Sequence, residues 1–207
     1  MLIVRPLVML ACGTRIEGAE KLPKFGPAII VANHNSHLDA LVLMSLFPFS
    51  SIESIRPVAA FDYFFKNRLL RFISEKLIGI LPIDRKRGYK TKGAYPLQPI
   101  LDALDRGEII IIFPEGSRGE PGKLKPFKSG FAHLTKMRPD VPVIPVTLSG
   151  TERSLPKDEA LWVPFVIEIK IYSSYYYNGN VKSFTKSIER LFLADSRYSY
   201  APAEQKS

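Results

Sequence analysis

Glu108-Ile109-Ile110-Ile111-Ile112-Phe113 is the clearest strand in this 207-residue chain. Its four consecutive isoleucines are β-branched and leave neither face polar, a pattern typical of a strand buried on both sides in the middle of a sheet. The polar loop Pro114-Glu115-Gly116-Ser117-Arg118-Gly119 follows it directly. The sequence therefore predicts a central strand that delivers a polar, glycine-containing loop to one edge of a sheet.

Strands and helices alternate on both sides of this stretch. Short β-branched or alternating runs predict further strands at 27–32, 56–60, 78–83, 141–148 and 163–171. Apolar residues at helical spacing predict helices at 38–47, 62–73, 94–106, 129–137 and 181–191. Pro142 and Pro145 mark the 141–148 strand as bulged or as an edge of the sheet. The alternation predicts a single α/β domain with a mixed central β-sheet flanked by helices.

The composition is basic and poor in metal ligands. The chain has 29 Lys and Arg against 20 Asp and Glu, a net charge of +9 and 46% hydrophobic residues. A domain of this length buries a full core without disulfides or a metal. Its single cysteine, Cys12, excludes an internal disulfide, and only three histidines are present, too few soft ligands for a structural zinc site. We therefore expect no bound metal and a reducing compartment.

The positive charge indicates an anionic partner, which on composition alone is nucleic acid, a membrane surface, or a phosphorylated or acidic substrate. Ten basic residues against three acidic ones lie between Arg56 and Lys92, which accounts for +7 of the net +9. A second cluster comprises Lys123, Lys125, Lys128, Lys136 and Arg138. Either cluster taken alone is equally compatible with a solvated positive face.

Several enzyme classes lose their main support because their motifs are absent. The chain has no Gly-x-x-x-x-Gly-Lys-Ser/Thr, no Gly-x-Gly-x-x-Gly, no Gly-x-Ser-x-Gly and no His-Glu-x-x-His. Kinase, dehydrogenase, serine-hydrolase and zinc-protease interpretations are therefore disfavoured. What remains is the polar cluster Asn33-His34-Asn35-Ser36-His37-Leu38-Asp39, at the predicted junction between a strand and a helix.

His34 and Asp39 are the candidate catalytic pair of this cluster. His34 follows the predicted strand, and Asp39 lies five residues later in the first turn of the predicted helix, so its carboxylate can return to the imidazole. A histidine held in this way has one ring nitrogen fixed as a donor, and the other is free to accept a proton from a hydroxyl. The alternative is that Asp39 only completes a capping box with Ser36 and that His34 is an ordinary turn histidine. His37 is predicted to be a surface or packing residue at the helix start.

The loop after the central strand is the candidate anion site. Two glycines let backbone N–H groups approach an anion, and Arg118 offers a bidentate phosphate contact. The alternative is a solvated turn. Arg85, in the run Asp84-Arg85-Lys86-Arg87, and Lys128 supply cations from two other loops. A hydroxyl activator beside several phosphate-binding groups predicts transfer onto a phosphorylated alcohol.

Four segments together resemble the four motifs of the glycerolipid acyltransferases in order and spacing. They are Asn33–Asp39, Gly79–Arg85, Phe113–Arg118 and Val141–Val146, and the resemblance runs from Ile16 to Leu148. It implies that His34 is a general base oriented by Asp39. The acceptor hydroxyl would attack a fatty acyl thioester carried by coenzyme A or acyl carrier protein, with no covalent acyl-enzyme and no bound cofactor.

The resemblance also implies roles for the remaining site residues. Arg85, Glu115, Gly116 and Arg118 match the family's acceptor and phosphate-binding positions, and Ser117 stands where a threonine is common. Lys128 is a looser match that we also assign to phosphate, and Pro145 matches a motif that shapes the acyl-donor side. The backbone amides of Gly116 and Ser117 are candidates for stabilising the oxyanion. His37 stands where family members often carry a bulky aromatic residue.

The function implied is acylation of a lysophospholipid, foremost 1-acylglycerol-3-phosphate to give phosphatidic acid, in phospholipid biosynthesis. The alternatives are another lyso-lipid or a glycerol-3-phosphate-like acceptor, or a non-catalytic module that binds anionic lipid. Retention of both His34 and Asp39 favours the enzyme. Nucleic-acid binding is disfavoured, because the cations cluster with Asp84 and Glu115 at strand ends and do not form a long helix face.

The domain organisation follows from the same resemblance. Residues 1–14 form an apolar segment that is too short to span a bilayer and is a candidate interfacial anchor. Residues 15–193 form the acyltransferase domain, and residues 194–207 form a polar tail. With the aromatic and basic segment Phe61–Phe72, residues 1–14 predict a peripheral protein on the cytoplasmic face of the cell membrane, with an anionic membrane surface and an acidic acyl carrier as partners.

Overall fold

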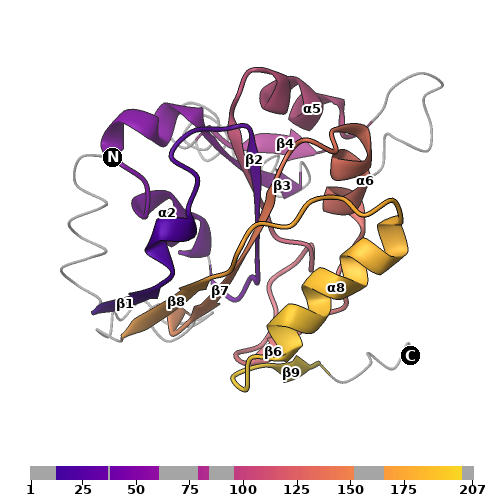
Figure 1. Ribbon diagram of the computed structural model, residues 1–207. Helices are drawn as coiled ribbons and strands as arrows, with labels where there is room; N and C mark the ends of the chain where they lie inside the picture. The colour runs from indigo at the N-terminus through magenta and orange to yellow at the C-terminus, as the bar shows by residue number, and fades with distance from the viewer. Residues whose placement is uncertain (1–12, 37, 61–78, 84–95, 152–165, 202–207) are drawn as a thin grey trace.

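The computed structural model describes residues 13–36, 38–60, 79–83, 96–151 and 166–201. Within these ranges, seven strands form one sheet, in the spatial order β1 (Thr14–Glu17), β8 (Ile167–Ile171), β7 (Val143–Ser149), β2 (Ala28–Ala32), β5 (Ile109–Ile112), β3 (Ile55–Ala60) and β4 (Leu81–Ile83). All neighbouring strands run parallel except β7 and β8, which are antiparallel. The predicted α/β domain with a mixed central sheet is therefore confirmed (Figure 1).

The helices cover both faces of this sheet (Figure 1). Ala28 and Ile30 of β2 pack toward the cluster that contains α2 (Asp39–Ser45). Ile29 and Val31 point to the opposite face, which is covered by α5 (Gln98–Asp105), α6 (Gly130–Met137) and α8 (Val181–Leu193). Every residue of β2 is buried, because successive side chains of a central strand enter two different cores.

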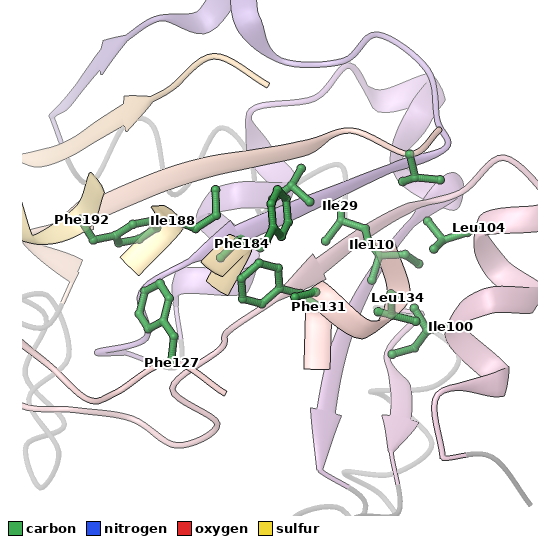
Figure 2. Close-up of a cluster of buried hydrophobic side chains, with 14 of the residues drawn as sticks. Ile29, Ile100, Leu104, Ile110, Phe127, Phe131, Leu134, Phe184, Ile188 and Phe192 are labelled. Atoms are coloured by element: carbon green, nitrogen blue, oxygen red, sulfur yellow. The ribbon is translucent and has the colours of Figure 1, made fainter. Parts of the chain in front are cut away.

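The second of these cores is rich in aromatic residues (Figure 2). Phe131 of α6 and Phe184 of α8 lie against Ile29 and Ile110 of the sheet. Burying a side chain of this size stabilises a domain by about 1.5–3 kcal/mol. This packing fixes α8 against the central strands β2 and β5, which lie far from it in the sequence.

The prediction that β7 is an edge strand is wrong, whereas a bulge is present in its pairing next to Pro145: Val146 pairs with Ile171 but Val143 pairs with Tyr175, so the partner segment has one residue more than β7 between the two pairs. β7 lies inside the sheet, between β2 and β8, and Pro145 stands in register with Val31. The carbonyl of Pro145 accepts a hydrogen bond from the Tyr172 amide at 3.0 Å, one residue beyond the end of β8. In an antiparallel pair the N–H and C=O of one residue face the same partner, so the N–H that proline lacks would also face Tyr172. The missing N–H of Pro145 therefore falls where the β7–β8 pairing ends.

Element boundaries differ from the predictions mainly at the ends. The predicted helix 38–47 is observed as α2, Asp39–Ser45, the strand 78–83 as β4, Leu81–Ile83, and the helix 94–106 as α5, Gln98–Asp105. Gly107, two residues after the end of α5, has a φ of 77° and is typical of a residue that terminates a helix. The predicted helix 62–73 and the segment 1–12 lie outside the described residues.

Short elements complete the fold. Two 3₁₀ helices, η1 (Ala19–Lys21) and η2 (Phe49–Ser54), lie in connections, and β6 (Lys123–Leu124) pairs with β9 (Ser199–Tyr200) in a small parallel sheet. Residues 194–201, the described part of the predicted C-terminal tail, pack on the domain, and Tyr198 is buried. None of the helices in the described ranges has an apolar run long enough to cross a bilayer.

Candidate active site

The candidate site lies at the carboxyl edge of the two central strands. β2 and β5 run parallel, with Val31 in register with Ile112, so both strands end at the same edge. His34 follows the end of β2, and the loop from Pro114 to Gly119 follows the end of β5. Open α/β sheets bind their ligands at such carboxyl ends. The two polar segments singled out in the sequence are therefore brought together.

His34 and Asp39 form a hydrogen-bonded pair. His34 Nδ1 lies 2.9 Å from Asp39 Oδ2, with the histidine side chain 23% exposed and the aspartate side chain fully buried. The same carboxylate oxygen accepts hydrogen bonds from the backbone N–H groups of Asn35 at 2.7 Å and Ser36 at 2.8 Å. These contacts fix Asp39 and place the imidazole proton on Nδ1, which leaves Nε2 available to accept a proton.

Only half of the predicted capping box forms. The Asp39 carboxylate accepts from the Ser36 amide, as a capping box requires, but Ser36 Oγ accepts from the Leu38 amide at 3.2 Å and not from the Asp39 amide. The Asp39 amide donates to the Ser36 carbonyl at 3.3 Å. Asp39 thus closes the turn before α2 and holds His34 at the same time.

Phe113 holds the plane of the His34 imidazole. Its ring stacks on that of His34, with centroids 4.2 Å apart and an angle of 20° between the planes. Phe113 is the residue that directly follows β5, so the central strand itself supplies this contact. No role for Phe113 was predicted from the sequence, where its only signal is that it stands between the isoleucine run and the polar loop.

Glu115 braces the main chain of the site. Oε1 accepts from the His34 amide at 2.8 Å, Oε2 accepts from the Lys125 amide at 3.0 Å, and the residue is 2% exposed. Gly119 N donates to the His34 carbonyl at 2.8 Å, so the loop holds the peptide groups on both sides of His34. Both carboxylate oxygens are engaged, and an ionised carboxylate repels phosphate. We therefore interpret Glu115 as a brace, not as the phosphate ligand that the resemblance implied.

Glu115 also makes stability depend on pH. Burial raises the pKa of its carboxyl group, and hydrogen bonds from the Lys125 and His34 amides only partly oppose this. The folded protein therefore retains this proton at a pH where the unfolded chain has lost it. The stability contributed by the group is present below the ordinary glutamate pKa of about 4.5 and is lost as the pH rises through the raised value.

We expect Glu115→Gln, which does not titrate, to remove this dependence. The free energy of unfolding of the wild type minus that of Glu115→Gln should fall from about pH 4.5 toward neutral pH, measured by urea denaturation. Glu120→Gln is the matched control: the Lys123 ammonium lowers the pKa of exposed Glu120, so the same difference should rise with pH only below about pH 4.5 and stay flat from there to neutral pH. A flat or rising difference for Glu115→Gln would contradict the assignment.

The cationic groups gather on the same loop. Gly116 has a φ of 75°, and a Cβ placed there would lie 2.6 Å from Lys128 Nζ, so a glycine lets the ammonium lie against the loop. Lys125 Nζ donates to Ser117 Oγ at 3.1 Å and to the Arg118 carbonyl at 3.2 Å. The sequence analysis placed Lys125 in a basic cluster but assigned it no site role. The structure brings it together with the predicted phosphate-binding loop.

The remaining predicted residues divide into three cases. Gly116 N donates to the Phe113 carbonyl at 3.0 Å, so its amide closes the turn and is not directed at an oxyanion. Pro145 is buried within β7, which pairs side by side with β2, the strand that leads to His34. Arg85 and His37 lie outside the described residues, although β4 ends at the same edge, two residues before Arg85.

Asn33 is a further site residue that sequence reasoning missed. Its side-chain amide donates to the Leu148 carbonyl at 2.9 Å, and its side-chain oxygen accepts from the Leu148 amide at 2.8 Å. These two hydrogen bonds to β7 fix the residue immediately before His34. Among the described residues, no group of His, Cys, Asp or Glu is arranged to hold a metal ion.

The fold and site define an α/β domain with a carboxylate-held histidine beside a cationic loop. This chain belongs to the Acyltransferase family, whose model matches residues 13–149. The predicted resemblance to the glycerolipid acyltransferases is thereby confirmed. The matched segment contains both the His34–Asp39 pair and the cationic loop, and it ends before β8 and α8.

Named relatives support the same family. The chain is 31% identical to 1-acyl-sn-glycerol-3-phosphate acyltransferase BAT2, chloroplastic, of Brassica napus, over 69% of this chain and 39% of that protein. It is 32% identical to 1-acyl-sn-glycerol-3-phosphate acyltransferase alpha of Mus musculus, over 77% of this chain and 55% of that protein. The chain thus spans about half or less of the length of these relatives.

A solved structure shares the fold. The crystal structure of the 1-acyl-sn-glycerophosphate acyltransferase PlsC from Thermotoga maritima matches with a TM-score of 0.72 and 22% identity, over 94% of this chain and 77% of that chain. This similarity extends beyond the matched family segment into the carboxyl-terminal part of the chain.

Proposed function

We propose that this protein transfers a fatty acyl group from an acyl thioester to the free hydroxyl of 1-acylglycerol-3-phosphate, giving phosphatidic acid for phospholipid biosynthesis. The observation that carries the proposal is the 2.9 Å contact between His34 Nδ1 and Asp39 Oδ2, next to a loop that gathers cations. The relatives named above, which are 1-acylglycerol-3-phosphate acyltransferases, support this choice of acceptor.

The pair acts as a general base in this proposal. The acceptor hydroxyl donates a hydrogen bond to His34 Nε2, and its oxygen attacks the thioester carbonyl while the imidazole takes the proton. The tetrahedral intermediate collapses by breaking the carbon–sulfur bond. The proton passes from the imidazolium to the departing thiolate, which leaves as a thiol. Buried Asp39 stabilises the imidazolium and keeps the ring in the productive tautomer.

The loop after β5 binds the acceptor phosphate. Arg118 offers a planar guanidinium, and Lys128 adds an ammonium that lies close to Gly116. Ser117 contributes its hydroxyl, which Lys125 contacts, and its backbone amide is the remaining candidate for oxyanion stabilisation. Arg85 is proposed to approach the same phosphate from the end of β4.

The acyl donor is coenzyme A thioester or acyl carrier protein thioester, and no resident cofactor is proposed. Both donors are anionic, which suits a chain of net charge +9. Attachment to the cytoplasmic face of the membrane remains a proposal, because it depends on residues 1–14 and Phe61–Phe72, most of which lie outside the described residues.

A panel of acceptors and donors analysed by mass spectrometry tests the proposal. The purified protein should esterify 1-acylglycerol-3-phosphate faster than other lyso-lipids or glycerol 3-phosphate. A preference for one of those other acceptors would support the alternative substrate. Binding to anionic vesicles with no ester formed from any acceptor would overturn the enzymatic proposal and support a lipid-binding module.

Arg118→Ala should chiefly weaken binding of a phosphorylated acceptor. Loss of a charge-assisted hydrogen bond costs about 1.5–3 kcal/mol, so we expect KM for 1-acylglycerol-3-phosphate to rise by about 10- to 100-fold. Initial rates with monoacylglycerol, which has no phosphate, provide the comparison. Lys136→Ala, at an exposed position of α6, is the matched cationic control. An equal loss with both acceptors would contradict phosphate recognition by Arg118.

A further inference from the structure

A buried carboxylate outside the segment matched by the family model contacts the cationic loop. Glu189 lies in α8 and is fully buried, whereas the family model ends at residue 149. Its Oε1 accepts a hydrogen bond from the Phe127 amide at 2.9 Å. Its other oxygen accepts from Lys186 Nζ on the same helix. Buried glutamates are rare unless paired, so this one requires an explanation.

The contact completes the anchoring of the segment from Lys125 to Lys128. Lys125 N donates to the Glu115 carboxylate at 3.0 Å, Phe127 N to Glu189 at 2.9 Å, and Lys128 N to the Pro114 carbonyl at 2.9 Å. Pro126 has no N–H to donate. Every backbone donor of this segment is therefore satisfied, and two of the three acceptors are carboxylates.

The two carboxylates that hold the segment come from different elements of the fold. Glu115 belongs to the loop after β5, which also holds the His34 main chain. Glu189 belongs to α8, which Ile188 and Phe192 anchor in the second core, and Phe192 packs edge to face on Phe127 at 5.1 Å (Figure 2). The side chains of Lys125 and Lys128 are thus presented from a segment whose backbone is fixed at both ends.

The strand after α8 adds support to the preceding residues. Ser199 N donates to the Gly122 carbonyl at 3.0 Å, and Ala201 N donates to the Leu124 carbonyl at 2.9 Å. β6 and β9 lie beside the carboxyl end of α8 in Figure 1. The carboxyl-terminal part of the chain therefore holds the loop from Gly122 through Phe127.

We propose that Glu189 is a positioning residue for acceptor recognition: it fixes the Lys125–Lys128 segment so that both ammonium groups face the acceptor phosphate. The inference rests on the proposed function. Glu189 touches neither substrate nor reacting atoms; it acts through Lys125 and Lys128. Removing it leaves the Phe127 amide without its acceptor, which favours displacement of the two lysines, while the His34–Asp39 pair keeps its own contacts.

The decisive experiment measures kcat and KM for two acceptors in three variants. We expect Glu189→Leu to raise KM for 1-acylglycerol-3-phosphate by about 5- to 50-fold with kcat changed less than about twofold. KM for monoacylglycerol and for the acyl donor should stay near the wild-type values. Glu189→Gln keeps an oxygen for the Phe127 amide and should restore KM to near the wild-type value. Lys186→Met removes the ion pair alone and is the matched control.

The outcomes separate this inference from its alternatives. The inference is overturned if Glu189→Leu raises KM equally for both acceptors. It is also overturned if Lys186→Met raises KM for 1-acylglycerol-3-phosphate as much as Glu189→Leu does. Should Glu189→Leu not fold, Glu189→Asp keeps the charge but shortens its reach by one methylene, and an unchanged KM in that variant would likewise overturn the inference. The proposed function fails separately, if the wild type acylates no lysophospholipid.

Discussion

His34→Ala should lower kcat by about 10²- to 10⁴-fold, the range typical of a removed general base. The reason is that Nδ1 is committed to Asp39 at 2.9 Å, so Nε2 is the group left to accept the hydroxyl proton. The free energy of unfolding should change by only about 1 kcal/mol, because Asp39 keeps its hydrogen bonds from the Asn35 and Ser36 amides.

Steady-state kinetics and urea denaturation of the same preparation check this prediction. His133→Ala is the matched control, because His133 is a second histidine, exposed on α6 on the face away from the core. That variant should keep wild-type kcat. Full activity in His34→Ala would contradict the proposed role of His34. A large loss of stability would mean that lower activity comes from unfolding and not from loss of the general base.

Asp39→Asn should lower kcat by a comparable factor, about 10²- to 10⁴-fold. An asparagine oxygen can still accept from the Asn35 and Ser36 amides, so the turn before α2 is retained. That oxygen also faces His34 Nδ1, so the contact with the ring is retained, but the negative charge that stabilises the imidazolium is lost. The effect should therefore appear in kcat at nearly unchanged KM for both substrates.

This variant also separates the two interpretations of Asp39. An asparagine oxygen can accept from the Ser36 amide as the carboxylate does, so a role confined to the capping box predicts little change in either activity or stability. Asp102→Asn, on the exposed face of α5, is the matched control and should be neutral in kcat. Wild-type kcat in Asp39→Asn would reduce Asp39 to a capping residue.

The layers of this fold were predictable because strong local patterns favour them. Ile109, Ile110 and Ile111 of β5 are buried although they alternate between the two faces, and β8 alternates between buried and partly buried residues, as a period of two requires. α8 carries its apolar residues at helical spacing and buries Phe184, Ile188 and Phe192. In each case the residues that define the pattern are neighbours in the chain.

The position of β7 in the sheet was not predictable in the same way. Proline is disfavoured in central strands, and Pro145 therefore indicated an edge. The cost of a missing N–H depends on whether an acceptor lies opposite it in the neighbouring strand. Here β8 ends at Ile171, opposite Val146, so the position opposite Pro145 lies beyond the strand. Strand order in the sheet is a property of contacts between distant segments, which a local rule does not contain.

The same distinction separates the predicted and the unpredicted parts of the site. His34 and Asp39 are five residues apart, so the spacing itself predicted their contact. Glu115 is 81 residues from His34, and its carboxylate could be read from the sequence only as part of a motif. The structure turns it inward, onto backbone amides. Phe113 and Asn33 were missed because their partners are rings and peptide groups of distant segments.

By itself, the sequence determined the motifs that mark the family: a histidine and an aspartate five residues apart, a loop that carries cations, and the order in which these motifs meet the strands. These properties reside in residue type and short spacing. The tertiary structure decided which charged groups are free to act and which are used internally. Glu189, 62 residues from Phe127, illustrates why: a carboxylate becomes a brace only when folding buries it against an amide that no neighbouring residue can satisfy.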